Sequence, residues 1–95
     1  MVCHEAEGKY VTYTVEFSRP ARKQLGGLPE NIRVRLARTI DRLVENPRPI
    51  GVEKLSGYED RYRVREGDYR IVYTIRDAVL IVLIVRVGHR KDIYR

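Results

Sequence analysis

The sequence predicts a small α+β domain in which a helical hairpin packs on one face of a curved sheet. Apolar and polar residues alternate over 9–17, and apolar residues recur at helical spacing over 29–46. Three further strand-like segments follow in the second half of the chain. We therefore expect an N-terminal strand, two helices and then a three-stranded antiparallel meander. The apolar stripe of the hairpin needs a surface to cover, so we expect it to lie on the sheet.

The length of 95 residues fits one domain. We expect it to span 10–95, after a flexible N-terminal extension over 1–9. The single cysteine, Cys3, excludes an internal disulfide and fits a reducing cytoplasm. Cys3 and His4 lack partners at metal-site spacing, so no metal site is expected. Neither a secretory signal nor an apolar run near the roughly 20 residues that cross a bilayer is visible, so we expect no membrane-spanning segment.

The first helix is marked at both ends. Ser18 is a typical N-cap, and Pro20 lies in the first turn, where its missing N–H costs nothing. Gly26-Gly27 ends the helix after about Leu25.

The second helix is expected from about Pro29 to about Asn46. Pro47 ends it, because a proline disfavours helical geometry at the preceding residue. Its apolar stripe should consist of Ile32, Leu36, Ala37, Ile40, Leu43 and Val44.

The strands of the meander are predicted over 61–65, 69–76 and 79–87, with turns at 66–68 and 76–78. A short extended piece is expected near 53–55, in the loop between the second helix and the meander. The near-continuous Val/Leu/Ile run of 79–87 favours a central strand covered on both faces.

Positive charge is concentrated in the last third of the chain. The segment 61–95 holds nine basic and four acidic side chains, which is +5 of the formal net charge of +6. A sequence pI near 9.8 fits an anionic partner: a nucleic acid, a membrane surface or an acidic protein.

Strand geometry predicts where these cations point. Successive side chains alternate between the faces of a strand, so Arg61, Arg63 and Arg65 share one face and Tyr62 and Val64 share the other. In the next strand, Arg70 lies on one face and a series of apolar residues lies on the other. That series is Tyr69, Ile71, Tyr73 and Ile75. If both apolar sets face the helices, a row of guanidinium groups lines the open face of the sheet.

Several short motifs, in order, resemble the RelE/ParE toxin superfamily over about 10–95. The motifs are Phe17-Ser18, Asn46-Pro47, Lys54-Leu55-Ser56-Gly57, Tyr62-Arg63-Val64-Arg65, Gly67-Asp68-Tyr69-Arg70, Gly88-His89-Arg90 and Asp92-Ile93-Tyr94. The chain is most similar to the RelE-type branch, because basic residues occupy the sheet and close the chain.

The resemblance implies that the protein is the toxin of a toxin–antitoxin pair and acts in the cytoplasm. It also implies that the toxin is an endoribonuclease that cuts mRNA in the ribosomal A site. In that family the RNA 2′-hydroxyl attacks the adjacent phosphate without a metal or other cofactor. The resemblance also implies neutralisation by an antitoxin protein, for which a heterotetramer is one assembly.

Carried over by position, Arg70 and Arg90 correspond to two phosphate-clamping arginines, and Tyr94 to a tyrosine that positions a base. Arg63 and Arg65 stand where the best-known member has lysines. An arginine does not lose its proton, so neither is a credible general base; His89 is the expected substitute because imidazole titrates near neutral pH. The catalytic set is thus Arg65, Arg70, His89, Arg90 and Tyr94, and the RNA-binding set is Lys54, Arg61, Arg63 and Lys91.

Two other functions stay open at this point. The same fold supports a ParE-like toxin directed at DNA gyrase, which would not need basic residues on the open sheet. A catalytically weak member that only binds RNA or antitoxin is the other alternative, supported by the arginines at 63 and 65.

Overall fold

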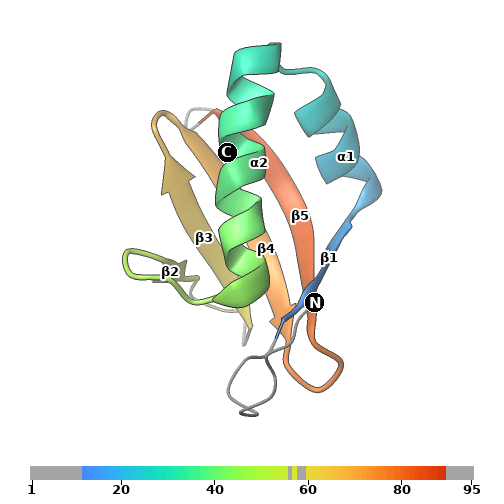
Figure 1. The fold of residues 1–95 in the computed structure, drawn as a ribbon, viewed down its shortest axis with the longest axis vertical. Coiled ribbons are helices and arrows are strands. Elements are labelled where there is room, and N and C mark those ends of the chain that lie inside the picture. The colour runs from blue at the N-terminus through green and yellow to red at the C-terminus, as the bar shows by residue number, and fades with distance from the viewer. Residues whose placement is uncertain (1–11, 56, 58–59, 90–95) are drawn as a thin grey trace.

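The computed structural model describes residues 12–55, 57 and 60–89, and its strands form one five-stranded sheet in the order β1-β5-β4-β3-β2 (Figure 1). The predicted α+β class is confirmed, and β3, β4 and β5 form the expected antiparallel meander. The sheet is mixed, because β1 pairs in parallel with β5. The strands are β1 (Thr14–Phe17), β2 (Glu53–Lys54), β3 (Arg61–Glu66), β4 (Tyr69–Arg76) and β5 (Ile81–His89). The predicted extension over 1–9 lies outside the described residues.

The two helices, α1 (Arg19–Gly26) and α2 (Glu30–Glu45), end within one or two residues of the predicted positions. Ser18 is the N-cap of α1, since its Oγ accepts a hydrogen bond from the N–H of Ala21 at 3.1 Å. α2 crosses one face of the sheet, whereas α1 lies beside β5 (Figure 1). β1 pairs with residues 81–84 of β5, and α1 lies beside the part of β5 that follows. There Gln24 Oε1 accepts a 2.8 Å hydrogen bond from the N–H of Val87.

The core lies between α2 and the sheet. Leu36, Ile40 and Leu43 of α2 are buried, but Ala37 of the predicted stripe is exposed, because it lies one position around the helix from that line. The sheet contributes the buried apolar side chains Val64, Ile71, Tyr73, Ile75, Val82, Ile84 and Val87. This packing fixes which face of each strand is turned toward α2 and which is left open.

The turn between β4 and β5 is longer than predicted. It occupies residues 77–80, so β5 begins at Ile81 rather than at 79, and it continues to His89. Leu80 adopts a φ of 57°, which interrupts extended geometry, and its carbonyl accepts a 2.8 Å bond from the N–H of Thr14. β5 is central, as expected, but its open face is only partly covered, because Leu83 and Val85 remain half-buried.

Pro47 and Arg48 tie the loop that leads from α2 to β2 to the sheet and to the turn after β4. The fully buried Tyr73 hydroxyl donates a 2.6 Å hydrogen bond to the carbonyl of Pro47. Arg48 forms an ion pair with Asp77 at 2.9 Å, and Asp77 also accepts a 2.6 Å bond from the Tyr13 hydroxyl. These contacts hold the start of the loop against β4 and the following turn.

Replacing Tyr73 by phenylalanine should destabilise the fold by about 1–2 kcal/mol, because the buried Pro47 carbonyl then loses its partner. The free energy of unfolding from urea titrations measures this effect. Tyr13→Phe is the matched control: it removes a hydroxyl that bonds in an exposed position, so its cost should be smaller. Equal costs for the two variants would contradict the assigned role of Tyr73.

The Asp77 contacts predict an acid-sensitive contribution to stability. The hydrogen bonds from Arg48 and Tyr13 lower the pKa of Asp77 below its ordinary value of 3.8. The unfolded state therefore binds a proton more readily, so the stabilisation is present above pH 3.8 and is lost as the pH falls through the folded-state pKa. Asp77→Asn should flatten the decline of the unfolding midpoint in this acid range. Arg48→Gln should flatten it in the same way, and an unchanged slope in both variants would disprove the linkage.

Candidate nucleic-acid interface

Arginines of β3, β4 and β5 line the face of the sheet turned away from α2, and we call Arg61, Arg63, Arg65, Arg70 and Arg86 the arginine face. Residues directly opposite each other in neighbouring strands point to the same side of a sheet. The rows on the open side are Arg65–Arg70–Gly88, Arg63–Val72–Arg86 and Arg61–Thr74–Leu83. The rows on the other side, such as Val64–Ile71–Val87, belong to the core. The structure therefore brings Arg61, Arg63, Arg65 and Arg70 to one surface, as alternation predicts, and adds Arg86.

Arg86 joins this set through a β-bulge. Val72 pairs with Arg86, but the next residue, Tyr73, pairs with Ile84, so Val85 is an extra residue in β5. A regular strand would place Arg86 on the same side as the buried Val82 and Ile84. The extra residue reverses this alternation, so Arg86 faces the open side.

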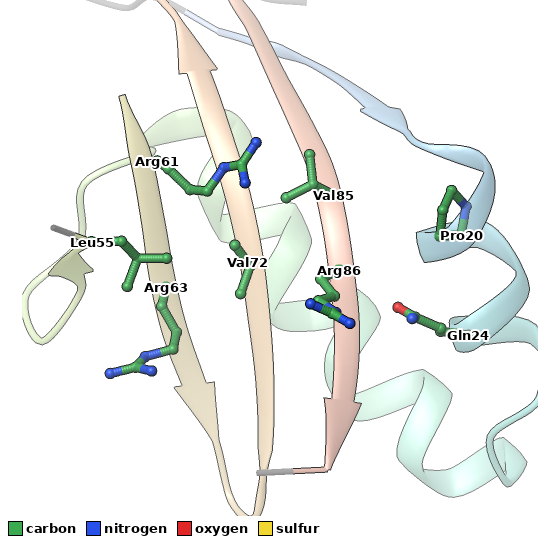
Figure 2. A pocket seen from close by; sticks show the side chains of 8 residues that line it. All are labelled: Pro20, Gln24, Leu55, Arg61, Arg63, Val72, Val85 and Arg86. Carbon is green, nitrogen blue, oxygen red and sulfur yellow. The ribbon is translucent and has the colours of Figure 1, made fainter. Parts of the chain in front are cut away.

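A shallow hollow of about 360 Å³ crosses the arginine face (Figure 2). Val72 and Val85 contribute apolar surface to it. The Arg61 side chain extends over β4 and Arg86 lies on β5, whereas the Arg63 guanidinium group turns to the outer side of β3 (Figure 2). α1 borders the hollow on one side and Leu55, next to β2, on the other. Its lining residues are Pro20, Gln24, Leu55, Arg61, Arg63, Val72, Val85 and Arg86. Cations around an apolar surface can bind a nucleic-acid strand, because the strand has both charged phosphates and apolar base faces.

A second hollow of about 210 Å³ adjoins the first and shares Arg63 with it. Its other lining residues are Gly51, Glu53, Arg65 and Arg70. Arg70 is 6% exposed, so its charge is held close to the sheet. Of the described residues, three with guanidinium groups and one with a carboxylate thus line a space large enough for a phosphate group.

The carboxylate of this second hollow is paired with the arginine opposite it. Glu53 and Arg63 are register partners across β2 and β3, and Arg63 Nε donates to Glu53 Oε1 at 3.0 Å. Arg63 Nη2 donates to the same oxygen. These bonds, followed by the charges of Arg63, Arg65 and Arg70, lower the pKa of Glu53. Glu53 is therefore ionised at neutral pH.

Two predicted site residues lie on the other side of the sheet. His89 is the register partner of Tyr69, and their rings meet edge to face with centroids 5.4 Å apart. Tyr69 packs against the core, so His89 does not share the face of Arg70. Lys54 is the register partner of Tyr62 and lines a different hollow, next to Arg48 and Asp60. The structure thus separates both residues from the arginine face.

Three other predicted site residues, Arg90, Lys91 and Tyr94, lie outside the described residues. Two charged residues that line these hollows, Arg86 and Glu53, were not assigned from the sequence. Arg86 reaches the open face because of the bulge, which side-chain alternation in the sequence does not reveal. Glu53 reaches it because the two-residue strand β2 pairs with β3.

Within the described part of the chain, no group of three or more acidic, histidine or cysteine side chains is arranged to hold a metal ion. The helices of the described residues include none long and apolar enough to cross a membrane.

Comparison with known proteins identifies the family. Residues 15–94 match the family described as ParE toxin of type II toxin–antitoxin system, parDE. The chain is 37% identical to toxin RelG of Mycobacterium tuberculosis, over 87% of this chain and 97% of that protein. It is 31% identical to the mRNA interferase toxin RelE of Escherichia coli, over 85% of this chain and 86% of that protein.

Solved structures agree with these sequence matches. A RelBE toxin–antitoxin complex of M. tuberculosis aligns with a TM-score of 0.74 and 33% identity, covering 84% of this chain and 93% of the other. The intact E. coli RelBE complex aligns with a TM-score of 0.74 and 29% identity, covering 81% and 95%. The fold, the basic sheet and these relatives together show that the chain belongs to the RelE/ParE superfamily of type II toxins, with the RelE-type toxins among its relatives.

Proposed function

We propose that this toxin is an endoribonuclease that cleaves mRNA in the ribosomal A site. The observation that carries the proposal is the convergence of Arg63, Arg65 and Arg70 on one hollow of the open sheet. Attack of a ribose 2′-hydroxyl on the neighbouring phosphate builds negative charge on the phosphate oxygens. Fixed guanidinium groups stabilise that charge through paired hydrogen bonds. The relative named mRNA interferase toxin RelE supports the same substrate class.

The reaction proposed here needs no metal. Arginine charges replace the positive charge that a metal ion would supply, and the nucleophile belongs to the RNA itself. The protein's work is then to hold the phosphate, align the 2′-oxygen with the leaving 5′-oxygen and assist proton transfer. Arg90 and Tyr94 remain proposed members of this site on the family resemblance alone.

We also propose that an antitoxin protein neutralises the toxin by wrapping around the domain. The aligned M. tuberculosis and E. coli structures are toxin–antitoxin complexes. A partner with acidic side chains would match the arginine face, and an extended segment can follow a shallow surface of this kind. A heterotetramer is one assembly of the two proteins, and ribosome-directed action would take place in the cytoplasm.

A gyrase-directed toxin is the second candidate, because the matched family carries the ParE description. The arginine face favours the nuclease, since poisoning a protein target does not require guanidinium groups on the open sheet. Incubating the protein with gyrase and supercoiled plasmid tests the alternative. Accumulation of gyrase-linked cleaved DNA, without any cutting of ribosome-bound mRNA, would replace the nuclease proposal.

Arg70→Ala should lower the cleavage of mRNA on programmed ribosomes about 100- to 1000-fold, as expected for loss of a donor to transition-state charge. Mapping of mRNA 5′-ends gives the position and the single-turnover rate of cutting. Arg33→Ala, at an exposed position of α2, is the matched control and should cut like the parent protein. The absence of A-site cuts by the parent protein, under conditions in which a known RelE cuts, would refute the function.

Arg86→Ala should weaken binding of a non-cleavable, 2′-O-methylated mRNA fragment and change its salt dependence. Removing one cation that binds a phosphate of single-stranded RNA should reduce the slope of log K against log salt by about 0.7. Fluorescence anisotropy at several salt concentrations measures this slope. Arg33→Ala again serves as the charge-matched control, and an unchanged slope for Arg86→Ala would remove Arg86 from the RNA-binding surface.

A further inference from the structure

Among the residues that the structure describes, one carboxylate and three guanidinium groups line the hollow next to β2. Arg63, Arg65 and Arg70 can hold a phosphate there, but none of them can accept a proton at neutral pH. The reaction proposed above needs an acceptor for the proton of the attacking 2′-hydroxyl. Within the described part of the chain, Glu53 is the side-chain acceptor that lines this same space.

The geometry of Glu53 suits that role. Both bonds from Arg63 end on Oε1, and no bond from the described residues ends on Oε2. One oxygen is therefore fixed to the sheet, while the other has the capacity to accept a new hydrogen bond. The side chain of Glu53 is 62% exposed, so an RNA chain lying on the open face can reach it.

The other candidates within the described residues lie elsewhere. The His89 ring packs against Tyr69 on the side of the sheet that carries the core. Glu66 also faces that side, where it accepts a 3.0 Å bond from Thr39 of α2. Lys54 lines a separate hollow. None of these groups shares the hollow of Arg65 and Arg70.

We propose that Glu53 is the general base of this nuclease, an inference that rests on the proposed function. The Glu53 carboxylate takes the proton from the 2′-hydroxyl as the 2′-oxygen forms a bond to phosphorus. The bond between phosphorus and the 5′-oxygen breaks, and the departing 5′-oxygen takes a proton from water. The products are a 2′,3′-cyclic phosphate and a 5′-hydroxyl group.

The surrounding charges adjust Glu53 to this task. In the free protein, the bonds from Arg63 and the charges of Arg65 and Arg70 lower its pKa, so it is present as the carboxylate. A bound phosphodiester adds a negative charge beside it and is itself held by the same cations. A like charge raises the pKa of a carboxyl group, so substrate binding makes Glu53 a stronger base at the moment of reaction.

A different role for Glu53 has the opposite consequence. If the carboxylate only occupied Arg63 until RNA displaced it, its removal would make that cation available to the RNA and speed cleavage. If it is the general base, its removal slows cleavage while RNA binding is preserved or strengthened. The sign of the change in rate therefore distinguishes the two roles.

The test compares the parent protein, Glu53→Gln, Glu53→Asp and Glu16→Gln in single-turnover cleavage of mRNA on programmed ribosomes. Glu53→Gln should cut at least about 100-fold more slowly, the loss typical of a missing general base. Glu53→Asp, which keeps the carboxylate, should recover part of the rate. Glu16→Gln removes an exposed carboxylate from β1, at the opposite edge of the sheet, and should match the parent. Binding of 2′-O-methylated mRNA, measured in parallel, should be unchanged or tighter for Glu53→Gln.

Each result decides the matter. Slow cleavage with intact binding by Glu53→Gln supports the general base. Cleavage at or above the parent rate overturns it and leaves the nuclease function standing. Equal losses of cleavage and of RNA binding also overturn it, because the role is then structural. An inactive parent protein overturns the proposed function and the role of Glu53 together.

Discussion

The hydrogen-bond register of β3, β4 and β5 is the constraint on which the rest of this structure depends. It assigns every side chain of the meander either to the core under α2 or to the open face. The apolar set on the core side makes a slip of one residue very costly, because the slip would expose that set and bury the arginines. Burial on one face thus fixes the position of the guanidinium groups on the other, and the site inherits its rigidity from the core.

Concentrating cations on one face opposes folding, since like charges repel and a held charge loses hydration. Arg70 is buried and lies directly opposite Arg65. Glu53, which pairs with Arg63, adds a negative charge to this region. The loop that leads to β2, and so to Glu53, is held by Tyr73 and Asp77 through Pro47 and Arg48. Stability and site geometry are coupled through this loop.

Arginine in place of lysine on β3 changes the chemistry available to the site. A guanidinium group holds phosphate through two directed hydrogen bonds and keeps its charge at any physiological pH. It offers no route for proton removal. In the proposed reaction, Arg63, Arg65 and Arg70 would bind the phosphate charge, and a separate group would have to accept the proton. The closeness of Glu53 to these cations gives that division a structural basis.

The sequence alone determined the class of fold, the helix boundaries near Ser18 and Asn46, and the common face of Arg61, Arg63 and Arg65. Those features follow from local rules: capping, proline geometry and alternation along a strand. Only the tertiary structure decided that β1 joins β5, that a bulge at Val85 turns Arg86 outward, and that His89 faces the core side. It also placed Glu53 opposite Arg63. Pairing between distant segments and a one-residue bulge leave no periodic signal in the chain, because they are selected by how the whole sheet packs against α2.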